Sequence, residues 1–262
     1  MLIQILDKLK VPGGVRVGSE GHQELWDALL SDDLDVYTEF VGTALNRIIK
    51  APYQPRAIAL QVMREAAAKH NIVWLDPIGS DNTYGLLMSR ARAEALGVSK
   101  MSDLARHAQS LRLVAGEKYL QNIPPLNFAP GGYDACCERY GFRFGETVTV
   151  PLVYGETFLA FERGEADIVM DFVVNPYIEL LDMVELQDDR EVFANYYICP
   201  VASAAFLERV PEARAALLGL AWTLDNRTMA KINYQIEFEG RAPEDLAREF
   251  VARLAERQPV AA

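Results

Sequence analysis

The segment DLDVYTEFVGTAL, residues 33–45, gathers side chains that could hold a positively charged ligand. Tyr37 and Phe40 stand beside carboxylates and the hydroxyl of Thr43, at the end of a short apolar run and on a glycine-containing turn that opens a helix. Aromatic ring faces attract the diffuse charge of a quaternary ammonium group, which cannot donate a hydrogen bond. Aromatic residues at strand ends are equally typical of an ordinary core. The residues of this segment alone leave both interpretations open.

The sequence carries no recognisable catalytic, nucleotide-binding or metal-binding pattern. It has no GxGxxG, GxxxxGK[ST] or GxSxG motif, and its histidines lack the spacing of metal ligands. The odd number of cysteines, two of them adjacent, argues against a disulfide framework, and we interpret them as small apolar core residues. Asp167 and Asp171 could be imagined as an acid–base pair, but aspartates at strand ends are usually structural. We therefore predict a protein without catalytic residues, metal or cofactor.

Composition and charge narrow the class of ligand. A chain of 262 residues can bury a large core and suits two medium-sized lobes. Its net charge of −11 argues against binding to nucleic acid or to an anionic membrane surface, and it mildly favours a cationic ligand. No apolar run approaches the length that a membrane-spanning helix needs. The first residues, MLIQILDKLKVPGG, carry charge inside a helical pattern and do not form a secretory signal.

Alternating helices and strands must position these side chains. Apolar residues recur at helical spacing, or in short runs bounded by Gly, Pro and Asp. The predicted helices cover residues 2–9, 23–30, 57–70, 101–108, 133–140, 156–163, 204–210, 212–224, 226–238 and 243–256, and the predicted strands cover residues 15–17, 34–37, 72–75, 83–89, 111–115, 147–152 and 168–172. This alternation predicts an α/β fold with parallel βαβ units. The tail beyond Pro200 has no predicted strand and must pack on a lobe built earlier in the chain.

One helix–turn–strand pattern occurs twice. ALLSDDLDVY, residues 28–37, and AFERGEADIV, residues 160–169, share a helix end, a polar turn, an aspartate and an apolar strand. The repetition suggests two similar lobes. Helix–turn–strand units also look alike in unrelated α/β proteins, so the pattern by itself leaves both explanations open.

Five segments resemble, in order along the chain, the substrate-binding proteins of ABC importers for quaternary-ammonium osmoprotectants such as glycine betaine, choline and carnitine. The family's DVYPEYTGTAL is present as DVYTEFVGTAL, NNTYALAV as DNTYGLLM, GEIDVVxxYSTD as GEADIVMDFVVN, and FPPYxxxPV as FANYYICPV. The tail LNxxVxxxGxxPExVAxxFL is present as INYQIEFEGRAPEDLAREFV. The resemblance covers nearly the whole chain, and its first and last segments are distinctive.

The resemblance implies a two-lobed, type II periplasmic-binding-protein fold whose lobes close over a ligand by rotation about a hinge. Lobe I would comprise residues 1–86 and 200–262, and lobe II residues 87–199. Strand-like crossings between the lobes would lie near residues 86–89 and 197–201. The family's first strand is expected to precede the start of this sequence and therefore to be missing from it.

In this family, aromatic rings form a cage around the cation of the ligand. The ring positions that the resemblance implies are Phe40, Tyr84, Phe172 and either Tyr196 or Tyr197. Thr43 matches a hydroxyl that would face the polar group of the ligand, and Asn82 lies in the same DNTYG segment as one ring and is taken as a further contact. Each ring face contributes roughly 0.5–2 kcal/mol, so four rings supply roughly 2–8 kcal/mol of the about 8 kcal/mol that micromolar binding requires.

Departures from the family pattern narrow the ligand further. Phe40 and Phe172 stand where the family usually has Tyr, and the arginine that clamps a betaine carboxylate falls on Ala129. The family's GGT turn becomes Glu20-Gly21-His22, where Glu20 could pair with a cation and His22 could bind the ligand or cap the next helix. Because a bidentate arginine is a large part of carboxylate recognition, we expect a choline-like cation rather than glycine betaine.

The resemblance thus implies a periplasmic or otherwise extracytoplasmic monomer that delivers a small cationic solute to an ABC permease and its ATPase. No signal peptide is present in the sequence. The alternative function is a ligand-sensing regulatory module of the same fold that binds another small molecule. The sequence has no helix-turn-helix segment and no basic face, which argues against direct binding to DNA.

Overall fold

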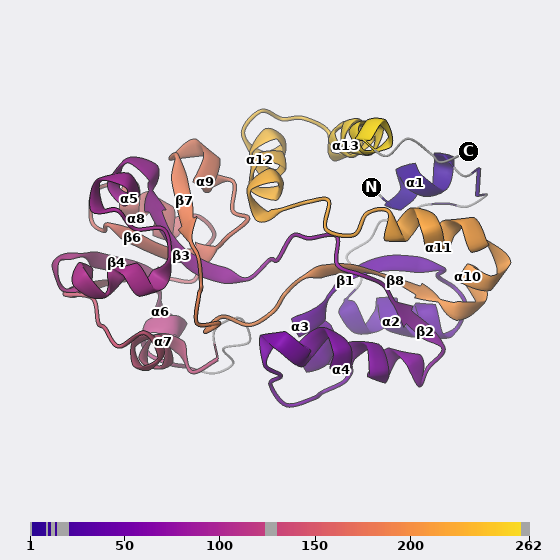
Figure 1. Cartoon of the computed structure of the whole chain (residues 1–262), viewed down its shortest axis with the longest axis horizontal. Coiled ribbons are helices and arrows are strands. Elements are labelled where there is room, and N and C mark those ends of the chain that lie inside the picture. Colours follow the sequence, from indigo (N-terminus) through magenta and orange to yellow (C-terminus); the bar gives the residue numbers. More distant parts are fainter. Residues whose placement is uncertain (1, 9, 12–13, 15–20, 124–129, 258–262) are drawn as a thin grey trace. The chain divides into compact units, whose positions relative to one another are not determined.

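A computed structural model describes residues 2–8, 10–11, 14, 21–123 and 130–257 of the chain. The predicted strand at residues 15–17, Glu20 and Ala129 lie outside the described residues. The chain divides into two units (Figure 1). Unit 1 comprises Met1–Ser80, Tyr197–Asp225 and Gln235–Ala262, and unit 2 comprises Asp81–Tyr196 and Asn226–Tyr234.

Unit 1 is built on a three-stranded sheet with the strand order β1-β8-β2, in which both outer strands run antiparallel to β8. Its strands are β1 (Val36–Phe40), β2 (Ile72–Trp74) and β8 (Ile198–Ser203). Its helices are α1 (Leu2–Lys8), α2 (His22–Leu30), α3 (Val41–Thr43), the π-helical turn η1 (Ala44–Ile48), α4 (Arg56–Ala68), α10 (Ala204–Arg209), α11 (Pro211–Leu218) and α13 (Pro243–Arg257).

The central strand β8 is buried on both faces of this sheet. Cys199 and Val201 pack with apolar residues of α2 and α4, whereas Ala202 packs with apolar residues of α10 and α11. Successive side chains of a strand point to opposite faces of the sheet, so the consecutive residues Val201 and Ala202 face opposite sides. Helices therefore cover both faces. The two faces of the sheet thus contribute separate apolar cores to unit 1.

Unit 2 contains a five-stranded mixed sheet with the order β5-β4-β6-β3-β7. Strand β4 pairs in parallel with β5 and β6, whereas β3 pairs antiparallel with β6 and β7. Its strands are β3 (Tyr84–Ser89), β4 (Arg112–Gly116), β5 (Glu146–Val150), β6 (Ile168–Phe172) and β7 (Met183–Leu186). Its helices are α5 (Arg90–Leu96), the 3-10 turns η2 (Met101–Arg106) and η3 (Ala108–Ser110), α6 (Glu117–Leu120), α7 (Gly132–Tyr140), α8 (Glu156–Glu162) and α9 (Tyr177–Leu180).

Of two predictions about the sheets, one is confirmed in part and the other is wrong. The predicted parallel βαβ units occur in unit 2, where β4 pairs in parallel with β5 and β6, but the sheet of unit 1 is antiparallel. The tail also contains a strand, because β8 runs through Pro200, which lies opposite Thr38 in the register. Proline is disfavoured in a central strand, yet the Pro200 carbonyl still accepts a 3.0 Å hydrogen bond from the Leu75 backbone N–H.

The chain returns from unit 2 to unit 1 between Tyr196 and Tyr197, beside the crossing expected near residues 197–201, whereas its first change of unit precedes the crossing expected near residues 86–89. Residues 86–89 lie inside β3, which pairs with strands on both of its sides, and the chain passes from unit 1 to unit 2 between Ser80 and Asp81. The tail also serves both units, because residues 226–234 of α12 (Asn226–Glu237) belong to unit 2. There the Asn226 side-chain oxygen accepts a 2.8 Å hydrogen bond from the Asp81 N–H.

The described residues contain no helix that is long and apolar enough to cross a membrane. Across the same part of the chain, no group of three or more His, Cys, Asp or Glu side chains could hold a metal ion. Cys136, Cys137 and Cys199 are all buried, as expected for core residues.

Candidate ligand-binding site

Two predicted ring positions lie side by side in unit 2. Tyr84 begins β3, Phe172 ends β6, and the antiparallel register places the two residues directly opposite each other. Their ring centroids are 4.4 Å apart, with an angle of 31° between the ring planes. Directly opposed residues share one face of a sheet, so the two half-buried rings pack against each other there.

Asp171, which precedes Phe172 on β6, carries a carboxylate with no basic partner among the described residues. Asp171 Oδ2 accepts a 2.6 Å hydrogen bond from the Thr157 hydroxyl, and Oδ1 accepts bonds from the Phe172 backbone N–H at 2.7 Å and the Asn175 amide at 3.4 Å. Burial raises the pKa of Asp171 above its ordinary value, although these hydrogen bonds oppose the shift. Burial, with a smaller contribution from the Asp171 charge, raises the pKa of Tyr84 to about 12.

Unit 1 places Phe40 and Thr43 on one turn. Phe40 ends β1, and the next residue, Val41, begins α3 and donates its backbone N–H to the Tyr197 carbonyl at 3.1 Å. This bond ties the turn to β8, beside which Phe40 lies opposite Ile198. Thr43 is buried within α3, with 8% of its surface exposed. The strand end and the start of the following helix therefore fix the Phe40 backbone.

A second carboxylate precedes the ring of unit 1. Glu39 is only 2% exposed, and its Oε1 accepts a 2.6 Å hydrogen bond from the Phe40 backbone N–H. Its Oε2 lies 2.8 Å from Nδ1 of His22, the first residue of α2. No side chain caps this helix at Gly21, so the imidazole of His22 serves Glu39 instead of the helix end. Burial raises the pKa of Glu39, and its hydrogen bonds to Phe40 and His22 oppose that shift.

The structure distinguishes the two alternative tyrosines. Tyr196 is only 2% exposed, and its backbone N–H and carbonyl bond to Asp81 Oδ1 at 2.7 Å and to the Asn82 N–H at 3.1 Å. Tyr197 is half-buried, and the Arg56 guanidinium carbon lies 5.2 Å from its ring centroid. A ligand cation can reach that face of Tyr197 only if Arg56 moves, because like charges repel.

Trp222 is an aromatic residue near Tyr197 that the sequence patterns did not reveal. The predicted helix 212–224 ends at Leu218, and Trp222 is 59% exposed with a left-handed backbone at a φ of 58°. The Trp222 backbone N–H donates to the Pro77 carbonyl at 2.9 Å. The Trp222 ring meets that of Tyr197 edge-on, with the ring centroids 5.2 Å apart. The polar residues Thr223 and Asp225 just before α12 were the available signal that the first helix had ended.

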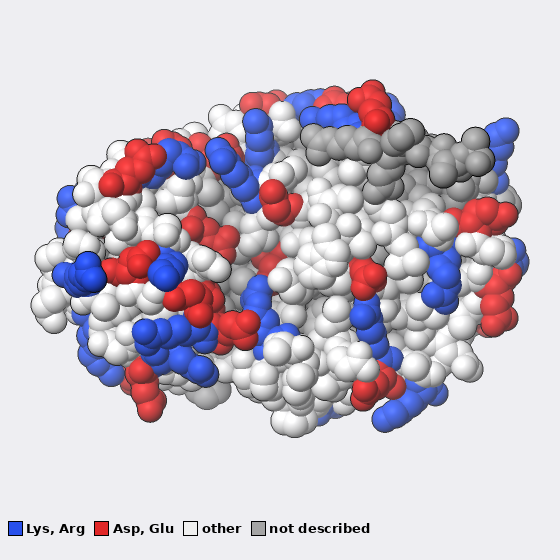
Figure 2. Space-filling model, in the orientation of Figure 1, with Lys and Arg blue, Asp and Glu red and all other residues white. Residues whose placement is uncertain are grey.

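The face of the molecule in Figure 2 carries no large patch of only positive or only negative side chains. On the face shown in Figure 2, Lys and Arg side chains are interspersed with Asp and Glu side chains. Such a surface gives no directional attraction for a polyanion.

The predicted site residues fall into two groups. Unit 2 holds Tyr84, Phe172, Asn82 and Tyr196, and unit 1 holds Phe40, Thr43, His22 and Tyr197. Contact of both groups with one ligand stays a prediction. Glu20 lies outside the described residues.

Comparison with known proteins places the chain among solute-binding domains. The profile of a family described as "Substrate binding domain of ABC-type glycine betaine transport system" matches residues 2–253. The Helicobacter pylori (strain G27) ergothioneine transport permease/ergothioneine binding protein is 27% identical over 255 residues, which cover 97% of this chain and 44% of that protein. The chain therefore spans less than half the length of this relative. The Pseudomonas aeruginosa glycine-betaine-binding protein is 26% identical over 227 residues, which cover 84% of this chain and 72% of that protein.

The fold agrees with solved structures. A crystal structure described as a glycine betaine/carnitine/choline ABC transporter superimposes with a TM-score of 0.82 at 23% identity, covering 96% of this chain and 91% of that one. At this level of identity the agreement concerns the fold. It confirms the predicted α/β, periplasmic-binding-protein-like fold, and the structure shows that this fold is built on two sheets.

Proposed function

This chain belongs to the family of substrate-binding domains of ABC-type glycine betaine transport systems, and we propose that it captures a quaternary-ammonium solute for uptake. The family consists of binding domains rather than enzymes. Its role implies a place outside the cytoplasm, where the ligand-bound protein meets an ABC permease driven by an ATPase. Family membership favours this role over a regulatory module of the same fold.

The observation that supports the ligand class is the ring pair of unit 2. The ring centroids of Tyr84 and Phe172 lie 4.4 Å apart. The residue before Phe172, Asp171, carries a carboxylate that has no basic partner among the described residues. Glycine betaine, carnitine, choline and ergothioneine, which the descriptions of similar proteins name, all carry a trimethylammonium group. Ring faces attract such a group and accept its methyl groups without a hydrogen bond.

We place the rings of both units around the same cation. Phe40 would contribute from unit 1, and Tyr84 and Phe172 from unit 2, with Tyr196 or Tyr197 as the fourth ring. Thr43 and Asn82 would contact the polar end of the ligand, and His22 would act through Glu39. Phenylalanine at positions 40 and 172 keeps a ring face without a hydroxyl, which suits a ligand recognised by its cation more than by a carboxylate. Choline is therefore the preferred probe.

A thermal-shift panel of choline, glycine betaine, carnitine and ergothioneine tests this function. A ligand at about 100 times its dissociation constant stabilises the folded state by about 2.7 kcal/mol. For a chain of this size, that stabilisation raises the melting temperature by roughly 5–10 °C. The neutral isostere 3,3-dimethylbutan-1-ol is the matched control and is expected to give a smaller shift. A melting temperature that no quaternary amine changes, even at high concentration, would contradict the proposal.

A further inference from the structure

The helix–turn–strand pattern that occurs twice in the sequence ends in the same pair of residue types in both units. In unit 1, α2 leads to β1, which ends in Glu39-Phe40. In unit 2, α8 leads to β6, which ends in Asp171-Phe172. Each acid accepts the backbone N–H of the phenylalanine that follows it, at 2.6 Å and 2.7 Å respectively. We call Glu39 and Asp171 the strand-end acids.

The helix before each strand supplies a second partner for the strand-end acid. His22, the first residue of α2, lies 2.8 Å from Glu39, and Thr157, the second residue of α8, donates its hydroxyl to Asp171 at 2.6 Å. The two units thus hold the acid in the same way with unrelated side chains. An arrangement that recurs with different residues indicates that the carboxylate itself is the constant feature.

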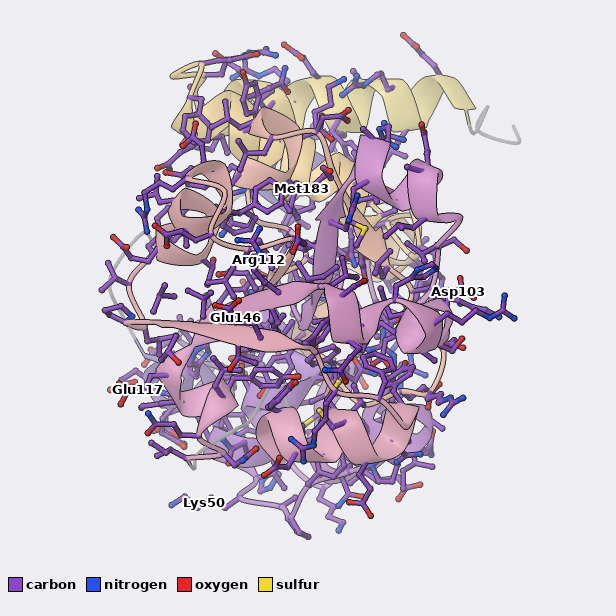
Figure 3. All side chains as sticks on the ribbon, turned by 90° about the vertical axis from the view of Figure 1, so that its left-hand side faces the viewer. Lys50, Asp103, Arg112, Glu117, Glu146 and Met183 are labelled. Carbon is purple, nitrogen blue, oxygen red and sulfur yellow. The ribbon has the colours of Figure 1, made fainter. Side chains whose placement is uncertain are left out.

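Each of the two helix–turn–strand segments also contains a second acid, which differs from the strand-end acid because it forms an ion pair with arginine. Asp35, at the turn before β1, lies 2.6 Å from an Arg209 guanidinium nitrogen. Asp167, at the turn before β6, lies 3.1 Å from Arg112 on β4, which is labelled in Figure 3. We call Asp35 and Asp167 the turn acids. The turn acids therefore stabilise each unit by ordinary ion pairs.

Among the described residues, neither strand-end acid forms an ion pair with Lys or Arg. Glu39 faces His22 from α2 and Tyr37 on its own strand, and Arg47 from η1 attracts it from a longer distance. A charge withdrawn from water without a close counter-ion costs free energy, and proteins retain such groups mainly where function needs them.

The surroundings of Asp171 contain no basic group at all among the described residues that contact it. Thr157 and Asn175 donate neutral hydrogen bonds, and the only titratable neighbour on the adjacent strand β3 is Tyr84. Gly85 on β3 is the register partner of Asp171. The Glu185 side chain on β7 reaches over Gly85: a side-chain carbon built on Gly85 would lie 3.8 Å from a Glu185 carboxylate oxygen. Among the residues that the structure describes, none that contacts Asp171 supplies positive charge at this strand end.

We propose that Glu39 and Asp171 supply the negative charge that balances the bound cation, one from each unit, acting through the protein behind Phe40 and Phe172 rather than by direct hydrogen bonds. This inference rests on the proposed function, since it requires a cationic ligand. It narrows the ligand class to compounds with net positive charge. The carboxylate of a zwitterion would be repelled by the same acids, so glycine betaine should bind more weakly than choline.

The inference requires that binding is linked to protonation. A cation favours the ionised form of a nearby acid, so ligand binding should release any proton that a strand-end acid still carries. Burial already raises the pKa of both acids in the free protein. Affinity for choline should therefore fall as the pH drops through these raised values, by up to about tenfold per pH unit for each linked acid.

Amide substitutions remove the charge and keep every hydrogen bond. In Glu39→Gln, the amide oxygen accepts the Phe40 N–H and the amide nitrogen donates to Nδ1 of His22. In Asp171→Asn, the oxygen accepts the Phe172 N–H, and the Thr157 hydroxyl rotates to accept from the amide nitrogen. The turn-acid variants Asp35→Asn and Asp167→Asn are matched controls, because they remove a charge from the same helix–turn–strand copies.

Calorimetric titration of choline between about pH 4.5 and about pH 8 tests the proposal. The wild type and both turn-acid variants should lose affinity as the pH falls. The double variant Glu39→Gln/Asp171→Asn should bind choline about tenfold or more weakly at neutral pH and show a flatter pH profile. A double variant with wild-type affinity and an unchanged pH profile would overturn the inference while leaving the proposed function intact. Failure of the wild type to bind any quaternary amine at any pH would overturn both.

Discussion

Replacing Phe172 with leucine separates the ring face of this residue from its apolar bulk. Leucine keeps a branched apolar side chain against the neighbouring core but has no π-electron surface. In the folded protein, the change removes the ring that lies 4.4 Å from Tyr84 and leaves the Asp171 hydrogen bonds to backbone and Thr157 in place. The variant Phe172→Leu therefore tests the aromatic face itself.

The expected loss follows from the value of one ring face. A single cation–π contact contributes roughly 0.5–2 kcal/mol, which corresponds to a dissociation constant raised by roughly 2- to 30-fold. Loss of the aromatic pair with Tyr84 costs about 0.5–1.5 kcal/mol of folding stability beyond burial, which lowers the melting temperature by about 1–6 °C. Both effects are within the range of standard calorimetry.

The assay is a pair of titrations on wild type, Phe172→Leu and Phe172→Tyr. Choline should bind more weakly to the leucine variant and about as tightly to the tyrosine variant, which keeps the ring. The neutral isostere 3,3-dimethylbutan-1-ol should bind to both variants with similar affinity, because it gains nothing from a π face. Equal losses for choline and for the neutral isostere in Phe172→Leu would refute the reasoning.

Three further predictions concern stability. Burial raises the pKa of Asp171 in the folded protein above its value in the unfolded chain, so ionisation of this carboxyl group opposes folding above the ordinary aspartate pKa range. Asp171→Asn should therefore melt at a higher temperature than wild type near neutral pH. This difference in melting temperature should vanish in acid. Burial alone would raise the pKa of Asp167, but the hydrogen bonds and charge of Arg112 outweigh burial and lower this pKa below its ordinary value. Asp167→Asn should therefore melt at a lower temperature than wild type at neutral pH. The two melting temperatures should converge as the pH falls through the lowered pKa. Thr157→Val removes a hydrogen bond to a carboxylate and should cost about 1.5–3 kcal/mol in urea unfolding. An Asp171→Asn variant that is less stable than wild type at neutral pH, or a Thr157→Val variant of unchanged stability, would contradict this description of Asp171.

Sequence patterns located most elements because their signals are local. The repeated helix–turn–strand copies correspond to α2–β1 and α8–β6, since helix ends, polar turns and apolar runs lie within a few residues of one another. The residue pattern of the tail did not predict β8, because Pro200 argues against a central strand. The resemblance implied only a strand-like crossing near residues 197–201, and the pairing with β1 and β2 shows that this segment is the central strand of a sheet.

The candidate site was only partly accessible from sequence for the same reason. Motifs pointed to Tyr84 and Phe172, but their direct opposition depends on strand register, which the sequence does not specify. The contrast between strand-end acids and turn acids was also hidden. Asp167 pairs with an arginine 55 residues away in sequence, whereas Asp171 bonds to no arginine in the part of the chain that the structure describes. No local sequence pattern separates the two aspartates.

Titration of choline into Phe40→Leu is the most direct test of the central claim that rings from both units hold one cation. Phe40 belongs to unit 1 and Phe172 to unit 2, so a shared ligand requires that each single substitution weakens the same binding event. We predict a dissociation constant raised by roughly 2- to 30-fold in Phe40→Leu, as in Phe172→Leu. Wild-type affinity in Phe40→Leu, alongside weakened binding in Phe172→Leu, would contradict the claim.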